Sequence, residues 1–298
     1  EWGYVTLVWA VKLVTDDVNV LLVLCAALTV YPVFWAVRRA SSAPVLSIFL
    51  YITFASYLFA FNGIRQAIAA SLILLAETFR RSHPAAWIAL YVVASLFHVS
   101  AVLILVAILI ARWQSSRPLR FLAIVCGGGV VVAGLLAVPS IAAALSSLNP
   151  RYGDYLESSV GAGGGTAMVL GVHVVLAGFL AFIVRKAPHR AELEGAGTLA
   201  EIASARARDS ELSGRDWIAI YILSCGALIG ALSNLVAGRF EPYFGIFVIL
   251  AVPPVLAGSR HPHAKGFAIA IALASVAYFV VHATSYNQLI PYSTFWGN

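Results

Sequence analysis

A short polar stretch, Asn62-Gly63-Ile64-Arg65-Gln66, interrupts an otherwise apolar sequence between residues 45 and 79. An arginine at the edge of hydrocarbon is costly without a partner, so it indicates a functional site. Asn62 and Gly63 are typical of a tight turn, and Asn62 is suited to cap a following helix. Arg65 would then occupy the first helical turn, where backbone N–H groups and the helix dipole already favour an anion. The alternative is an interfacial anchor whose guanidinium group reaches lipid phosphates.

The composition is that of a membrane protein. The chain has 298 residues, of which 61% are hydrophobic and 11% charged, and its mean hydropathy is +0.91. Long apolar runs with few charges are typical of transmembrane helices. The three cysteines, Cys25, Cys126 and Cys225, lie inside apolar runs without the spacing of a metal site or a disulfide framework. The net charge of +6 is accounted for by loop residues, so nucleic acid is not expected as a partner.

The sequence predicts an all-α, polytopic integral membrane protein, with residues 1–298 forming a single transmembrane domain. Residues 1–16 are typical of an interfacial helix with an aromatic belt, and Asp16-Asp17 of an N-cap for a first span at residues 18–37. Because the chain starts at Glu1 without an initiator Met, we expect a further segment to precede it. Counting the first span, about ten hydrophobic segments are expected. The others are residues 45–61, 64–79, 84–97, 99–111, 119–139, 167–185, 216–235, 241–257 and 265–284.

The basic residues predict the orientation in a bacterial cytoplasmic (inner) membrane. All but four of the 19 Lys and Arg residues fall in alternate loops, which the positive-inside rule assigns to the cytoplasm. The charged stretch at residues 186–215 is the longest of these cytoplasmic loops. The opposite, outer side keeps only Lys12, Arg65, Arg151 and Arg239.

Two of the apolar runs, at residues 84–97 and 99–111, are short for a span of about 20 residues. If they formed one continuous crossing, every later segment would have the opposite orientation in the membrane. We therefore prefer a broken helix pair that turns below the outer surface at Phe97-His98-Val99-Ser100. Non-helical backbone at that depth survives only inside protein or beside a water-filled cavity, so His98 would lie in a recess.

A second outer segment is the loop at residues 140–166, which contains Arg151, Tyr152 and a Gly-rich run. The glycines lack the context of a phosphate-binding loop and indicate flexibility. Such a loop could gate a site or serve as a solvated connector.

The residues expected on the outer face share one chemistry. Arg65 and Arg239 at membrane depth suit a phosphate or pyrophosphate, which arginine grips with two hydrogen bonds. Glu241 is two residues from Arg239 and could instead simply pair with it. Tyrosines near these arginines suit sugar rings and lipid interfaces, so a lipid-linked phosphate is the expected class of substrate. His173 and His282 are expected to be structural.

Four blocks resemble the EpsG family of membrane exopolysaccharide polymerases, which are related in role to Wzy-type polymerases. The two central blocks are the most specific, and the order and spacing extend over nearly the whole chain. The blocks are Glu1-Trp2-Gly3-Tyr4, Asn62-Gly63-Ile64-Arg65-Gln66-Ala67-Ile68-Ala69, Ala94-Ser95-Leu96-Phe97-His98-Val99-Ser100-Ala101, and Arg239-Phe240-Glu241-Pro242-Tyr243-Phe244 with Ile290-Pro291-Tyr292.

The resemblance implies transfer of a growing glycan from polyprenyl pyrophosphate to a lipid-linked repeat unit on the outer face. Arg65 and Arg239 would neutralise the leaving pyrophosphate, with Arg151 closing over it. His98 would take the proton of the acceptor hydroxyl, with Glu241 or Glu1 as the competing base. No metal or cofactor is expected. The remaining substrate-binding candidates are Tyr4, Asn62, Gln66, Ser100, Tyr152, Tyr243 and Tyr292.

Three other classes stay open. A flippase or exporter of lipid-linked oligosaccharide would also need an arginine-lined recess, but it predicts polar residues continuing through the membrane. Another polyprenyl-phosphate-sugar transferase or an acyl transferase would use the same outer residues. A structural scaffold would leave the outer arginines unexplained. Other membrane proteins of polysaccharide assembly are candidate partners.

Overall fold

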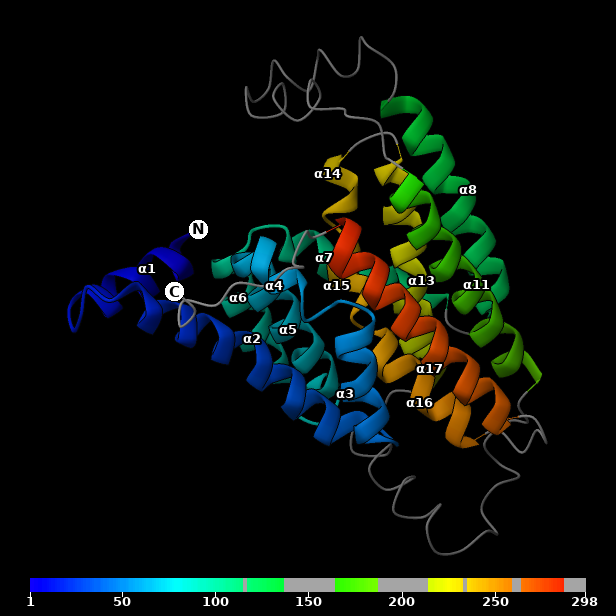
Figure 1. Ribbon diagram of the computed structural model, residues 1–298, viewed down its shortest axis with the longest axis horizontal. Coiled ribbons are helices and arrows are strands. Elements are labelled where there is room, and N and C mark those ends of the chain that lie inside the picture. Colours follow the sequence, from blue (N-terminus) through cyan, green and yellow to red (C-terminus); the bar gives the residue numbers. More distant parts are fainter. Residues whose placement is uncertain (115–116, 137–163, 187–213, 233–234, 259–263, 287–298) are drawn as a thin grey trace, which may run out of the picture.

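The computed structural model describes residues 1–114, 117–136, 164–186, 214–232, 235–258 and 264–286 (Figure 1). Every regular element in these ranges is helical, as predicted. Among the described residues, three helices are long and apolar enough to cross a membrane: Val18–Ala40, Gly165–Val184 and Gly266–Thr284. Several shorter apolar helices accompany them, so the architecture is that of a polytopic membrane protein. Most of the two loops predicted at residues 140–166 and 186–215 lies outside the described residues.

The N-terminal helices begin largely where the sequence predicts. Helix α1 spans Trp2–Lys12, and α2 spans Val18–Ala40. Asp17 caps α2, since its side chain accepts a hydrogen bond of 2.9 Å from the backbone N–H of Asn19. The next predicted segment, residues 45–61, is not one helix.

That segment is divided into α3, Pro44–Thr53, and a single turn α4, Phe59–Asn62. The chain leaves the helix at Ala55, whose φ of 58° lies in the left-handed region. Hydropathy alone did not reveal this break, because the segment contains no charged residue and no Gly or Pro between Phe54 and Leu58.

Helix α5, Ile64–Phe79, begins directly after Gly63. The predicted cap by Asn62 is wrong: Gly63 is the N-cap residue and no side chain caps the helix. A Cβ on Gly63 would lie 2.7 Å from Cζ of Phe59, so a larger residue would require the Phe59 ring to shift. Arg65 does occupy the first turn of α5, as predicted.

Helices α6, Pro84–Phe97, and α7, Ala101–Trp113, form the predicted broken pair. His98 between them is extended, with φ −153° and ψ 117°. The start of α6 and the end of α7 meet at the same carboxylate: Glu77 accepts hydrogen bonds from Trp87 and Tyr91 of α6 and pairs with Arg112 of α7. Helix α7 therefore returns to the end from which α6 started, and the alternative of one continuous crossing is wrong.

The second half of the described chain is organised around α13, Gly214–Ala231, which contacts α7, α8, α11, α14, α15 and α16. Figure 1 shows α8 and α11 along one edge of the molecule and α1 and α2 at the other. The predicted segment at residues 241–257 is divided at Ile246-Phe247 into α15 and α16. The remaining elements are α8 Pro118–Leu136, α11 Gly164–Lys186, α14 Leu235–Gly238, α15 Glu241–Gly245, α16 Val248–Gly258, α17 Ala264–Val281 and the π-helix η2 His282–Tyr286.

The close packing of α13 on α8 depends on Gly226. A Cβ there would lie 2.8 Å from Cγ1 of Val125, and β-branched valine is stiff at χ1. We expect Gly226→Ala to destabilise the folded protein by about 1–3 kcal/mol through overpacking. Thermal unfolding in detergent measures the difference. Gly171→Ala is the matched control, because its Cβ would meet open space while the gain in helix propensity is the same. Equal unfolding temperatures for the two variants would contradict this packing.

Candidate functional site

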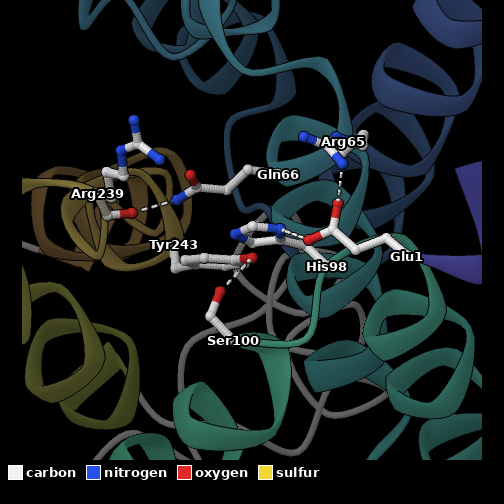
Figure 2. A network of polar contacts seen from close by, with 7 residues as sticks. All are labelled: Glu1, Arg65, Gln66, His98, Ser100, Arg239 and Tyr243. Carbon is white, nitrogen blue, oxygen red and sulfur yellow. Dashed lines mark hydrogen bonds and ion pairs between the residues drawn. The ribbon is translucent and has the colours of Figure 1, made fainter. Parts of the chain in front are cut away.

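One carboxylate joins three elements at the end of the molecule where α6 turns into α7. Glu1 lies between Arg65 of α5 and His98 of the turn (Figure 2). Its Oε2 is 2.6 Å from Nη1 of Arg65, and its Oε1 contacts Nδ1 of His98. We call the residues drawn in Figure 2 the His98 cluster: Glu1, Arg65, Gln66, His98, Ser100, Arg239 and Tyr243.

Glycine brings α1 close enough for this contact. A Cβ on Gly3 would lie 3.0 Å from the carbonyl atoms of Leu96 and 3.1 Å from the backbone N of Phe97. These are backbone atoms at the end of α6, immediately before His98, so α1 has no room to approach with a larger residue. Tyr4, one residue further, lies under Arg65, with 5.8 Å between the guanidinium carbon and the ring centroid.

The contact with Glu1 fixes the chemistry of His98. A carboxylate only accepts, so Nδ1 carries a proton, and a neutral His98 has its lone pair on Nε2. In Figure 2 this second nitrogen points away from Glu1, towards the side where Gln66 and Arg239 lie. The ring stacks on Tyr243 at 6.4 Å between centroids, and Ser100 donates a 3.0 Å hydrogen bond to the hydroxyl of Tyr243. These contacts hold the ring of His98 in one orientation.

Arg239 joins the same cluster through its backbone. Gln66, which is buried, donates from its amide to the carbonyl oxygen of Arg239, and thereby ties α5 to the segment before α15. The Arg239 side chain is exposed, and 53% of the Arg65 side chain is exposed. Two guanidinium groups are therefore accessible at one end of the protein, which is the arrangement an anionic ligand requires.

Glu241 belongs to a different group of side chains. Its Oε1 lies 3.9 Å from Nε2 of His173, whose Nδ1 lies 2.9 Å from Oγ of Ser224. His173 and Ser224 are buried, and Tyr221 stacks on His173 at 5.4 Å. We call Glu241, His173, Ser224 and Tyr221 the Glu241 cluster. The sequence alone associated Glu241 with Arg239 and predicted a structural role for His173. The signal that was missed is the presence of a Ser and a His inside otherwise apolar helices.

The model of the EpsG family matches residues 1–294. The chain belongs to the EpsG family. EpsG proteins are Wzy-like exopolysaccharide polymerases, so the coarse function is that of a membrane exopolysaccharide polymerase. Searches of curated proteins and of solved structures return no match.

The four sequence blocks that resemble EpsG proteins meet in space. Glu1, Arg65, His98 and Tyr243 come from four separate blocks, and the contacts described above join them in one cluster. Asn62 ends α4 and is exposed beside this cluster's helix α5. The other proposed substrate residues, Arg151, Tyr152 and Tyr292, lie outside the described residues. Within the described ranges, no group of three or more His, Cys, Asp or Glu residues could hold a metal ion.

The approach of α1 gives a test of the His98 cluster in this EpsG protein. Gly3→Ala should push α1 from the end of α6 and separate Glu1 from His98. We expect polymer formation to fall by about tenfold or more, since small misplacements of catalytic groups are costly. Gel sizing of the exopolysaccharide measures the effect. Gly266→Ala, whose Cβ would meet open space, serves as the control. Normal polymer from Gly3→Ala would contradict a role for Glu1.

Proposed function

We propose that this protein polymerises glycan on the outer face of the bacterial cytoplasmic membrane. It transfers a growing chain from polyprenyl pyrophosphate to the non-reducing end of a lipid-linked repeat unit. The observation that carries the proposal is the sharing of Glu1 between Arg65 and His98. A cation for the leaving group and a base for the acceptor are thereby held side by side.

Arg65 and Arg239 act on the leaving group. As the bond between the anomeric carbon and the pyrophosphate oxygen breaks, its electron pair stays with the pyrophosphate. Negative charge therefore develops there, and positioned guanidinium groups stabilise it. Arg65 has one short contact to Glu1 and a largely exposed side chain, which leaves donors for a phosphate.

His98 acts on the acceptor. The acceptor hydroxyl oxygen forms the new bond to the anomeric carbon, and its proton passes to Nε2 of His98. Glu1 then faces an imidazolium ion and stabilises it, in the way that a buried carboxylate supports histidine in hydrolytic triads. Tyr243, stacked on the ring, keeps the ring plane fixed.

Glu241 is the competing base, and its surroundings support that alternative. Ser224 has one hydroxyl proton, which it donates to the carbonyl oxygen of Tyr221 at 2.7 Å. Its oxygen therefore accepts from Nδ1–H of His173, and the lone pair on Nε2 of a neutral His173 faces Glu241. A proton taken up by Glu241 could pass on to His173.

The role of Arg65 is tested in a native host that lacks this gene and is complemented with variants. Arg65→Lys keeps the charge but loses the planar fork, and we expect polymerisation to fall by about a hundredfold. Lipid-linked sugars are extracted, sized and separated into inner-face and outer-face material. Single repeat units stranded outside support the proposal. Units stranded inside would mean that the protein moves its substrate. Arg38→Lys, an exposed residue of α2, is the control and should keep full activity.

The identity of the base is tested by the pH dependence of turnover in membrane vesicles. If His98 is the base, the wild-type rate falls on the acid side, because a protonated imidazole cannot accept. His98→Gln should abolish turnover or remove this acid limb. Glu241→Gln should leave the limb in place. An unchanged profile in His98→Gln, together with loss of turnover in Glu241→Gln, would assign the base to Glu241.

A further inference from the structure

At the opposite end of α6 lies a buried ion pair that the proposed reaction does not use. Glu77 is fully buried and accepts hydrogen bonds from Trp87 Nε1 at 3.0 Å and Tyr91 OH at 2.8 Å. Nη2 of Arg112 completes its surroundings. Glu77 is thus satisfied, as a buried carboxylate must be.

Arg112 itself is not satisfied. Only 7% of its side chain is exposed, and its Nε and Nη1 are buried without a hydrogen-bond partner. Nε of Arg80 is also buried without a hydrogen-bond partner. A buried guanidinium donor without an acceptor is costly, so these three donor nitrogens indicate a missing anion.

The charged groups around Arg80 also indicate a missing anion. Arg80 interacts electrostatically with Arg81 and Arg112, which repel it, and with Glu77 and Asp216, which attract it. Together with Arg80 itself, the guanidinium groups of this set outnumber the carboxylates, so the set carries net positive charge. A phosphodiester carries one negative charge and presents oxygens that two guanidinium groups can share.

Aromatic residues place this group at the level of lipid headgroups. Trp113 follows Arg112 directly and is 83% exposed, and Trp35 is 44% exposed while its ring contacts Phe79 at 5.7 Å, beside Arg80. Trp is enriched at membrane interfaces. The positive-inside rule predicts that this end is cytoplasmic, where basic pockets between helices bind anionic headgroups.

We propose that Arg80 and Arg112 form a binding site for the phosphodiester of an anionic phospholipid from the cytoplasmic leaflet. The headgroup phosphate accepts from the unpartnered nitrogens of both guanidinium groups. Glu77 holds Arg112 in place and so acts as a positioning residue. The site is separate from the His98 cluster and does not rest on the polymerase proposal.

Lipid retention tests this site without any assay of activity. The purified full chain is reconstituted in phosphatidylcholine with and without phosphatidylglycerol, and retained lipid is measured by native mass spectrometry. Wild type should retain phosphatidylglycerol preferentially. Arg80→Gln should weaken this retention by about tenfold, which is the effect of losing one charge-assisted hydrogen bond. Arg117→Gln removes the same charge from an exposed position at the same end and should change little.

Three outcomes would overturn the proposal. Equal losses in Arg80→Gln and Arg117→Gln would mean only diffuse attraction to the surface. If inorganic phosphate stabilises the wild type in phosphatidylcholine alone as much as phosphatidylglycerol does, the site binds a soluble anion. If Arg80→Gln does not fold, Arg112→Lys keeps the pair with Glu77 but loses the fork; undiminished retention in that variant would equally refute the site.

Discussion

The carboxylate of Glu77 is fully buried, and a buried charge is tolerated only when hydrogen-bond donors surround it. Two of the donors come from the start of α6 and one from the end of α7. Satisfying Glu77 therefore requires α6 to start, and α7 to finish, at the same end of the molecule. The chain must then reverse at their other end, and the reversal is the non-helical segment at His98. The His98 cluster depends on a charge that lies a whole helix length away.

The two polar clusters meet at a helix of five residues. Helix α15 contributes Tyr243 to the His98 cluster and Glu241 to the Glu241 cluster. The carboxylate of Glu241 lies against Gly245, where any side chain would displace it. Because α15 contacts both α5 and α13, it is one of the elements that join the two halves of the described chain. Both candidate bases are thus held by the same short element.

Sequence reasoning succeeded where a single physical rule decides the outcome. Apolar runs predicted helices, Asp17 predicted a cap, and the short runs on both sides of His98 predicted a reversal. It failed where the outcome depends on which residues pack against each other in the folded protein. Ala55 ends a helix inside a largely apolar run, and the N-cap of α5 is Gly63, against which the ring of Phe59 packs.

In the candidate site, too, some features could be predicted from the sequence and others could not. Glu1, Arg65 and His98 were expected on one face, and their blocks of sequence identified them. The pairing of Glu77 with Arg112 cannot be predicted from sequence distance, because Arg80 and Arg81 are nearer along the chain. The pairing of Glu241 with His173 depends on how α11 and α13 approach α15, which no local pattern reports.

The sharing of Glu1 has a thermodynamic consequence. One carboxylate serves both Arg65 and His98, so an anion that binds Arg65 competes with Glu1 for the guanidinium group and leaves Glu1 to His98 alone. Anion occupancy at Arg65 and the contact between Glu1 and His98 are then coupled. Coupling is reciprocal, so a change in the strength of the contact between Glu1 and His98 also changes the anion affinity at Arg65. Ligands bound at Arg65 and at His98 would influence one another through this one side chain.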